Sequence, residues 1–183
     1  MLQKEIFLTF DDGPVPGPTE FVLEELAKAD AKATFFCIGD NIRKNSSVFR
    51  KVVEAGHGIG NHTFHHLSGW KTDHDQYVAD VQLCLDEMTM QGASPLKLFR
   101  PPYGRIQRKQ IASLHDYRIV MWDVLTNDYA RNLAPEKSLA ESIAATRPGS
   151  IVVFHDSIKA ERNMNYVLPR FIDHFAEIGR AHV

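Results

Sequence analysis

Two adjacent carboxylates, Asp11 and Asp12, stand at the end of a short apolar run and directly before Gly13 and Pro14. The run itself, residues 6–10, favours a β-strand, and the Gly-Pro pair prevents the strand from continuing. The carboxylates are therefore expected at the carboxyl end of a buried strand, held by a sheet and open to solvent. Two carboxylates at such a short distance repel each other unless a cation or a shared proton offsets their negative charge. An ordinary turn explains the pair too, but a metal site or a proton-transfer site is the sharper hypothesis.

A second candidate group is the sequence Asn-His-Thr-Phe-His-His at 61–66, in which His62 and His66 are four residues apart. On one helical turn both imidazoles would project from the same side, a spacing that holds Zn²⁺ in several hydrolases. His65 is the competing partner at a spacing of three, and the pattern alone leaves that choice open. Two histidines and one aspartate leave other metal positions to water or substrate, as catalytic rather than structural metal sites do.

Three later strand ends carry further chemistry. Arg100 opens the sequence Arg-Pro-Pro-Tyr-Gly, and an arginine there can clamp a carboxylate with two hydrogen bonds. The two prolines fix the backbone, so the N–H of Tyr103 can point in a set direction, as an oxyanion donor must. Trp122 suits a wall for a sugar ring, and His155 is well placed to donate or accept a proton near neutral pH. Each residue alone has an ordinary structural explanation, but together, at successive strand ends, they indicate one site.

The elements that must position these groups alternate along the chain. Strands are predicted at about 6–10, 33–38, 56–62, 96–99, 118–122 and 150–154, and helices at about 19–29, 47–55, 72–91, 107–115, 135–146 and 162–178. Strands that alternate with helices indicate a parallel α/β fold, and no GxGxxG follows the first strand to favour a nucleotide-binding open sheet. A complete (β/α)₈ barrel takes ~250 residues. The 183 residues therefore predict a shortened or incomplete (β/α) barrel.

The composition excludes several classes of protein. Charged residues make up 24% and apolar residues 44%, as in an ordinary soluble globule. A formal charge of −2 gives no electrostatic case for nucleic acid, and no apolar run approaches the ~18 residues of a membrane span. Cys37 and Cys84 lie in apolar surroundings and are predicted to be core residues rather than metal ligands or a disulfide.

Domain organisation and location follow from the same pass along the chain. No repeat, low-complexity tract or linker interrupts residues 1–183, so we expect one domain and a monomer. The first five residues lead directly into the first predicted strand and leave no room for a signal peptide. The protein is thus expected to be cytoplasmic as written, or exported if a leader was removed.

The motifs together resemble those of the polysaccharide deacetylases of the NodB-homology type, carbohydrate esterase family 4, over nearly the whole chain. The sequence Thr-Phe-Asp-Asp-Gly-Pro at 9–14 is similar to the first motif of that family. This resemblance implies that Asp11 is the catalytic base and Asp12 a metal ligand. The family's H-[S/T]-x-x-H motif selects His62 and His66 as the other two ligands.

The later motifs carry the resemblance further. The R-x-P-Y motif implies that Arg100 orients the base and that the backbone N–H of Tyr103 contributes to an oxyanion hole. His155 matches the histidine that closes the last motif and serves as general acid. Val153 takes the place of the apolar residue that lines the pocket for the acetate methyl group. The family fold is a distorted TIM-like barrel, and its cofactor is one divalent metal ion, expected here to be Zn, with Co or Ni also accepted by two His and one Asp.

One motif departs from the family pattern. The family commonly has D-x-x-D-W, and the matching residues 125–129 read Leu-Thr-Asn-Asp-Tyr. Asp128 keeps the second acidic position, which the resemblance pairs with Arg100. Leu125 replaces the first aspartate and Tyr129 replaces the tryptophan. The departure concerns the substrate wall rather than the type of reaction.

The resemblance implies metal-dependent hydrolysis of an N-acetyl (or O-acetyl) group on a carbohydrate, an oligo- or polysaccharide containing N-acetylglucosamine, with release of acetate. Tyr103, Trp122 and Val153 are expected to form the substrate pocket. Two alternatives remain: a metal-dependent amidase acting on a non-carbohydrate amide or cyclic imide, and a non-catalytic sugar-binding barrel. A two-carboxylate glycosidase is disfavoured, because adjacent Asp11 and Asp12 can hardly straddle a glycosidic bond at a separation of ~5 Å or more. The motifs do not tell chitin oligomers, peptidoglycan and xylan apart.

Overall fold

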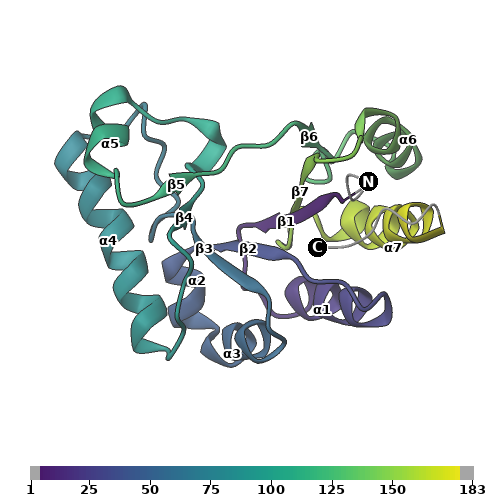
Figure 1. Cartoon of the computed structure of the whole chain (residues 1–183), viewed down its shortest axis with the longest axis horizontal. Helices are drawn as coiled ribbons and strands as arrows, with labels where there is room; N and C mark the ends of the chain where they lie inside the picture. The colour runs from purple at the N-terminus through teal and green to yellow at the C-terminus, as the bar shows by residue number, and fades with distance from the viewer. Residues whose placement is uncertain (1–4, 178–183) are drawn as a thin grey trace.

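The computed structural model describes residues 5–177 and contains one curled sheet of parallel strands with helices around it (Figure 1). The strands are β1 (Phe7–Asp11), β2 (Thr34–Cys37), β3 (Gly58–Asn61), β4 (Leu98–Phe99), β5 (Arg118–Ile119), β6 (Val124–Leu125) and β7 (Ile151–His155). Their order across the sheet is β5-β4-β3-β2-β1-β7-β6. Because β5 and β6 are the two edges, the sheet curls without closing, and the predicted incomplete (β/α) barrel is confirmed.

The helices follow the strands in the alternation that the sequence predicts. They are α1 (Pro18–Lys28), α2 (Gly39–Lys44), α3 (Ser46–Glu54), α4 (His74–Met90), α5 (Arg108–Ser113), α6 (Pro135–Ala145) and α7 (Glu161–Glu177), with a 3₁₀ turn, η1 (Pro102–Gly104). The predicted helix 162–178 is present over its described part, and residue 178 lies outside the described residues. Figure 1 shows α4 and α5 at one end of the molecule and α6 and α7 at the other. None of the helices within residues 5–177 has the length and apolar character needed to cross a membrane.

Two short elements escaped the sequence patterns. Helix α2 has six residues, too few for an apolar stripe to repeat, and it begins at the glycine that ends the preceding strand. Strand β6 has two residues and is defined by the pairing of Val124 with Val152 and of Leu125 with Val153. The strand predicted at 118–122 ends at Ile119 instead. Long-range pairing, rather than local preference, defines both edges of the sheet.

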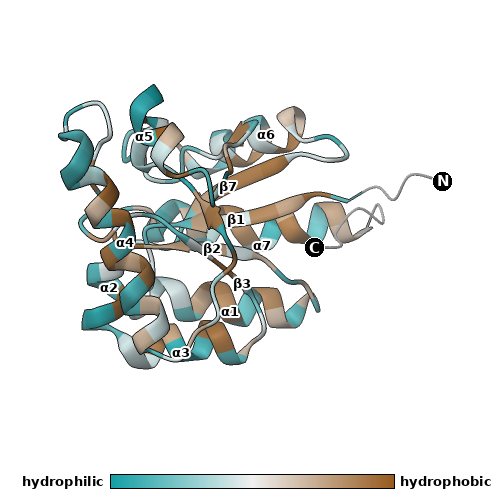
Figure 2. Ribbon diagram, turned by 60° about the vertical axis from the view of Figure 1, so that its left-hand side comes forward, coloured by the Kyte–Doolittle hydropathy of each residue, from teal (hydrophilic) through white to brown (hydrophobic). Residues whose placement is uncertain are grey.

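The centre of the sheet explains why its strands read as continuous apolar runs. Strands β1 and β7 pair along their whole length, from Phe7 opposite Ile151 to Asp11 opposite His155. Most of their side chains are buried on both faces of the sheet, as parallel strands covered by helices require. In Figure 2 these strands are among the most hydrophobic parts of the ribbon. The register also places the two polar ends, Asp11 and His155, side by side.

The aromatic residues of the central strands form the core beneath the site. The ring of Phe10 stacks on Phe35 at 5.1 Å and on Phe154 at 5.7 Å between ring centroids. Cys37 and Cys84 are both free and buried, as predicted for core residues. A packed core of this kind holds the strand ends in fixed positions, which a site built from several strands needs.

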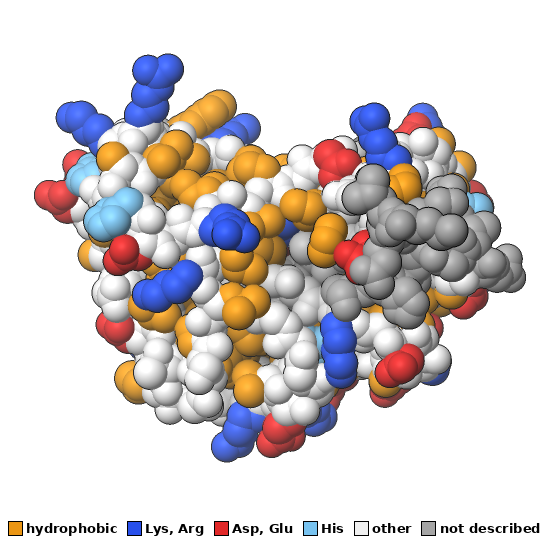
Figure 3. All heavy atoms as spheres, in the orientation of Figure 1, with side chains coloured by type: hydrophobic (Ala, Val, Ile, Leu, Met, Phe, Trp, Pro, Cys, Tyr) orange, Lys and Arg blue, Asp and Glu red, His pale blue; other side chains and the backbone are white. Residues whose placement is uncertain are grey.

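A short segment, residues 120–123, spans the open side of the barrel from β5 to β6 (Figure 1). Arg100 holds this segment from inside: its Nε donates to the carbonyl of Val120 at 3.1 Å and its Nη2 to that of Met121 at 3.4 Å. In Figure 3 the outline of the molecule is hollowed between the parts formed by α5 and α6. The segment that connects the two edges of the open sheet is thus tied to Arg100, a residue of the candidate site.

Candidate active site

The carboxyl ends of the strands surround a cavity of about 470 Å³. Its lining consists of Asp11, Asp12, His62, His66, Tyr103, Arg105, Trp122, Leu125, Tyr129, Val153, His155 and Lys159. Two further candidate residues, Arg100 and Asp128, are almost completely buried behind that lining. The candidate residues named from the sequence therefore lie in or directly behind one cleft, except His65, which does not line it.

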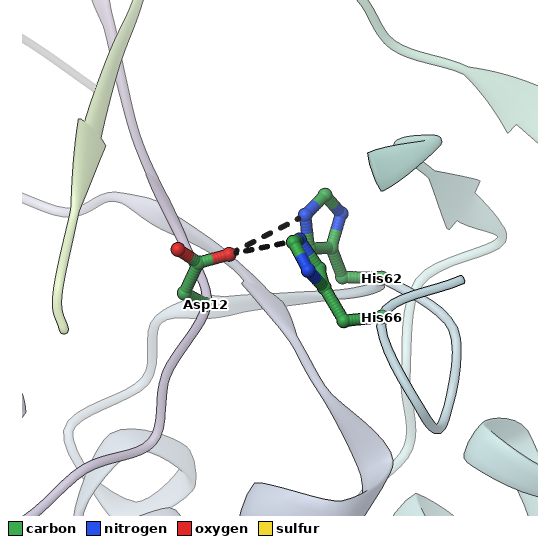
Figure 4. Close-up of side chains that lie close together, drawn as sticks. All are labelled: Asp12, His62 and His66. Atoms are coloured by element: carbon green, nitrogen blue, oxygen red, sulfur yellow. Dashed lines mark ion pairs between the residues drawn. The ribbon is translucent and has the colours of Figure 1, made fainter. Parts of the chain in front are cut away.

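Asp12, His62 and His66 form a compact group at the base of the cleft, which we call the ligand cluster (Figure 4). One ligand atom of each residue lies within 4.8 Å of the other two. The Oδ1 of Asp12 is 3.2 Å from Nε2 of His66 and 3.7 Å from Nε2 of His62. Both imidazoles point at the same carboxylate, which is the arrangement expected of three ligands around one cation.

The backbone around Asp12 is bent to aim its carboxylate into the cleft. Asp12 has φ +83°, in the left-handed region that non-glycine residues rarely adopt. The next residue, Gly13, donates its N–H to Oδ1 of Asp156 at 3.0 Å, and Thr19 donates its hydroxyl to Oδ2 at 2.6 Å. A Cβ on Gly13 would lie 1.9 Å from that carboxylate, so only glycine fits there. Asp156 thus holds the turn that carries the first ligand.

His62 and His66, the two candidate ligands, do not lie on a helical turn, so this part of the sequence interpretation is wrong. They lie in a loop after β3 in which Thr63 and His66 both have left-handed backbone, at φ +64° and +56°. The loop brings the rings of His62 and His66 to 5.1 Å between centroids. A loop with two residues of positive φ is held by tertiary contacts, which local spacing does not reveal.

Those contacts come from Asp80 on α4. Its Oδ2 accepts the N–H groups of Phe64 and His65 at 2.8 and 2.9 Å. Its Oδ1 lies 2.5 Å from Nδ1 of His65, whose side chain is 56% exposed. His65 is therefore engaged away from the ligand cluster, and of the two alternatives at this motif His66 is the residue that joins His62.

The tautomer of His62 suits a metal ligand. Its Nδ1 lies 2.7 Å from the carbonyl oxygen of Arg100, which accepts a hydrogen bond and therefore requires the proton on Nδ1. The unprotonated Nε2 then faces Asp12. Burial lowers the pKa of His62 to about 4, so the ring is neutral at physiological pH. The donor set of two imidazoles and one carboxylate fits Zn²⁺ or a similar divalent ion.

The ionised form of Asp12 is favoured by its surroundings. Burial alone would raise its pKa, but the hydrogen bond from His66 and the charge of His155 hold the pKa of Asp12 well below its usual range. The residue is therefore a carboxylate, which is the form that binds a cation.

Asp11 has a different set of partners from its neighbour. Nη1 of Arg100 donates to Oδ1 of Asp11 at 2.7 Å and to the hydroxyl of Thr9 at 2.8 Å. Both members of the ion pair are buried, and the guanidinium stacks over the ring of Phe36 at 4.1 Å. A buried charge is tolerated only when it is paired and hydrogen-bonded, and this pair meets both conditions.

His155 pairs with Asp128, and the pairing of Asp128 with Arg100 that the family resemblance implied is wrong. Nδ1 of His155 lies 2.7 Å from Oδ1 of Asp128, whose Oδ2 accepts the backbone N–H of His155 at 2.8 Å. Asp128 follows β6, the neighbour of β7, whereas Arg100 follows β4 on the far side of β1. Burial lowers the pKa of His155, but the charge and hydrogen bond of Asp128 outweigh it and raise the pKa to about 9.

Tyr103 presents its backbone at the rim of the cleft. It has φ +60° within the turn η1, and the N–H of Gly104 closes that turn on the carbonyl of Pro101 at 3.0 Å. Its ring packs 4.7 Å from that of His66 and is 60% exposed. The strained turn fixes the direction of the main chain beside the ligand cluster.

The apolar wall of the cleft comes from the two edges of the barrel opening. Trp122 lies in the segment 120–123 that connects β5 to β6, and Val153 lies on β7 in register with Leu125. The ring of Tyr129 meets that of His155 edge-on at 4.9 Å. Leu125 and Tyr129, the two departures from the family motif, therefore both lie in the cleft.

Sequence reasoning missed three residues that hold the site together. Thr9 accepts from Arg100, Asp80 fixes the histidine loop, and Asp156 fixes the turn after Asp12. Asp156 directly follows a candidate residue, and that position was a usable signal. Nothing local distinguishes Asp80 from the other acidic residues of its helix.

A family profile and individual relatives of known name point to the same protein family. The sequence profile of the polysaccharide deacetylases matches residues 1–122. A peptidoglycan-N-acetylglucosamine deacetylase of Bacillus cereus is 32% identical over 157 residues, which are 85% of this chain and 57% of that protein. A chitooligosaccharide deacetylase of Azorhizobium caulinodans is 37% identical over 161 residues, 84% of this chain and 74% of that protein. This chain therefore spans little more than half the length of the first relative.

The fold comparison agrees with the sequence comparison. The crystal structure of the Bc1960 peptidoglycan N-acetylglucosamine deacetylase, in complex with 4-naphthalen-1-yl-N-oxidanyl-benzamide, superposes with a TM-score of 0.94. The match covers 100% of this chain and 86% of that one at 28% identity. The curled parallel sheet described above is thus shared along the whole of this chain.

Proposed function

Because the chain belongs to the polysaccharide deacetylase family, we propose that it hydrolyses N-acetyl or O-acetyl groups on a carbohydrate and releases acetate. The preferred substrate is an oligo- or polysaccharide that contains N-acetylglucosamine, in line with the names of the two relatives, a peptidoglycan-N-acetylglucosamine deacetylase and a chitooligosaccharide deacetylase. The observation that carries the proposal is the arrangement of one cleft, in which a buried carboxylate, Asp11, and a protonated histidine, His155, both lie beside the ligand cluster.

The ligand cluster holds one divalent metal ion in this proposal, Zn first and Co or Ni next. Its support is the chemistry of the three donors: a carboxylate and two imidazoles, of which His62 is neutral with its free nitrogen turned toward Asp12. When bound, such an ion acts as a Lewis acid toward the acetyl carbonyl and the attacking water.

Asp11 acts as the general base. It takes one proton from the water as the water oxygen bonds to the acetyl carbon. Arg100 lies 2.7 Å from the carboxylate and keeps it oriented until that step. Arg100 is a positioning residue, since it is buried behind the lining of the cleft and reaches the reaction only through Asp11.

The tetrahedral oxyanion receives a hydrogen bond from the backbone N–H of Tyr103. The left-handed turn at this residue fixes the backbone before substrate binds, so no reorganisation is needed during the reaction. One such donor contributes about 3 kcal/mol to stabilisation of the transition state. The wall of Trp122, Leu125 and Val153 accommodates the methyl group of the acetyl.

His155 is the general acid. When the intermediate collapses, the C–N bond breaks and the sugar nitrogen takes a proton from His155, because an amide nitrogen leaves poorly as an anion. The proton that Asp11 took from the water restores the histidine in the following cycle. Asp128 holds His155 in its charged form through the contact at 2.7 Å.

Acetate release across a panel of acetylated glycans tests this function. We expect turnover of chitin oligomers, peptidoglycan fragments or acetylxylan that stops in excess chelator and returns with Zn²⁺. Small amides and cyclic imides belong in the same panel, because turnover of those alone would assign the cleft to the related amidases. A pure sugar-binding barrel would bind the glycans and release no acetate from any of them.

A further inference from the structure

Two cations, Arg105 and Lys159, line the mouth of the cleft that contains the ligand cluster. Arg105 follows β4 and Lys159 follows β7, so they approach the cleft from opposite sides of β1. Both residues are exposed. A substrate that reaches the ligand cluster therefore passes between two positive charges.

Each of these cations is held by an aromatic ring. The Cζ of Arg105 lies 5.3 Å from the ring centroid of Trp70, and Nζ of Lys159 lies 4.8 Å from that of Tyr129. Within residues 5–177 neither cation forms a salt bridge, whereas Lys137 on α6 pairs with Glu141. A cation over a ring is positioned but not neutralised, so it keeps its charge for a ligand.

The interior of the cleft does not need these cations for charge balance. Asp11 is already paired with Arg100 and Asp128 with His155, each at 2.7 Å. The remaining carboxylate belongs to the ligand cluster. The positive charge at the mouth is therefore directed toward something that arrives from solvent.

The support under Arg105 is rigid. Trp70 is 64% exposed, yet its Nε1 donates to the carbonyl of Ile106 at 3.3 Å. Gln110, fully buried, donates to the carbonyl of Gly69 at 3.0 Å, and the N–H of Gly69 donates to the carbonyl of Arg105 at 3.0 Å. A ring on a turn fixed in this way holds the guanidinium of Arg105 in place.

We propose that the cleft selects acetylated glycans whose sugars next to the acetylated residue carry carboxylates, over neutral glycans of the same length. Arg105 binds the carboxylate on one side of the reacting sugar and Lys159 the carboxylate on the other. This inference rests on the proposed function and deepens it by naming the substrate class. The carboxylate has two possible sources, a hexuronic acid or a lactyl ether as in muramic acid, and both present the same group to a guanidinium or an ammonium.

Equilibrium binding of glycans to the Zn²⁺-loaded full chain tests the inference. The variant Asp11→Asn is used for these measurements, because without its general base the protein does not hydrolyse the glycan while binding is measured. The probes are three tetrasaccharides: neutral N-acetylchitotetraose, a hyaluronan tetrasaccharide with glucuronate, and a peptide-free glycan tetrasaccharide with muramic acid. We expect at least one anionic probe to bind about fivefold or more tightly than the neutral one, with a preference that shrinks as salt is added. Comparison of the two anionic probes identifies the source of the carboxylate.

Variants at the rim assign the preference to its residues. In the Asp11→Asn background, Arg105→Gln and Lys159→Gln are each expected to weaken binding of the anionic probe by about twofold to fivefold, and binding of the neutral probe by less. Arg105→Lys, which keeps the charge, retains most of the preference. Arg108→Gln and Lys137→Gln are matched controls, since both residues are exposed and neither lines the cleft.

Equal affinity for neutral and anionic probes, or equal losses on both in the rim variants, overturns the inference while leaving deacetylation intact. Absence of acetate release by the native chain from every glycan, together with a clear anionic preference in binding, overturns the proposed function instead and leaves the ligand class standing. The two failures are therefore distinguishable.

Discussion

Two histidines in the cleft are held in the same way, but one ring is neutral and the other is positively charged. His62 follows β3 and His155 ends β7, and each is fixed through Nδ1 by a partner 2.7 Å away. The partner of His62 is a backbone carbonyl, and burial lowers the pKa of His62 to about 4. The partner of His155 is a carboxylate, which raises the pKa of His155 to about 9 despite burial.

Since both histidines are largely buried, the charge of the partner, rather than the depth of burial, decides whether the ring is neutral or protonated. The region around β3 supplies a neutral ring with a free nitrogen, as a metal ligand requires. The region around β7 supplies a charged ring that can give up a proton. The cleft thus keeps a cation-binding half and a proton-donating half on either side of β1.

Removal of the metal is expected to have the largest effect on activity, and it tests the cation-binding half of the cleft. We expect His62→Ala, or excess chelator, to lower acetate release on the order of 10³-fold or more, because several kcal/mol of carbonyl polarisation are lost. Metal content by mass spectrometry should fall from one ion per chain to near zero in the variant.

His65→Ala is the matched control for that experiment. Its imidazole pairs with Asp80 rather than with the ligand cluster, so the variant should keep the metal. Loss of the metal in His65→Ala together with retention in His66→Ala would reverse the assignment of the ligands.

Variants of the two adjacent carboxylates test whether Asp11 acts as the base and Asp12 as the metal ligand. Asp11→Asn should keep the metal and lose about 10³-fold in kcat, within the range of general base catalysis. Asp12→Asn should instead lose affinity for the metal, because its carboxylate faces both ligand histidines. Metal titration of the two variants side by side decides the matter, and equal loss of affinity in both would mean that the carboxylates share the ion.

Replacement of His155 is expected to affect substrates differently according to whether their leaving group needs a proton. His155→Ala should slow cleavage of N-acetyl substrates by about 10²-fold or more, because the amine needs a proton to depart. Aryl acetates should be affected much less, since a phenolate leaves unaided. Both substrates are measured on the one variant, and slowing by the same factor would reassign His155 to a positioning role.

The smallest effect is expected from the partner of His155. Asp128→Asn removes the negative charge that stabilises the imidazolium, so the pKa of His155 falls from about 9. A general acid works only while protonated, so the alkaline limb of kcat/KM should move to lower pH by about one to two units. A pH–rate profile at constant ionic strength measures the change.

Asp123→Asn provides the control for that profile. The carboxylate of Asp123 accepts from the hydroxyl of Ser150 and the N–H of Ile151, away from His155. Its removal should leave the alkaline limb in place. A limb that does not move in Asp128→Asn would contradict the assignment of His155 as the acid that titrates there.

Local patterns predicted most of the fold because each strand is an apolar run with its own stop signal. Residues 6–10 and 150–154 are examples, and the observed strands, Phe7–Asp11 and Ile151–His155, begin and end one residue later. The edges of the barrel were harder, since β6 has only two residues and exists through its pairing with β7. Pairing partners of that kind are distant in sequence and leave no local trace.

The residue types and their order along the chain indicate most of the reactive groups in the cleft, because polar residues that end buried parallel strands must meet at one edge of the sheet. Asp11, Asp12, His62 and His155 were all identified on that ground, together with the spacing of the histidines. Only the tertiary structure decided which group each of them faces. Asp128 pairs with His155 and not with Arg100, since the order of the strands puts β6 beside β7 and β4 across the barrel. Partner and charge state depend on a few ångströms of three-dimensional distance, which the order of residues along the chain does not specify.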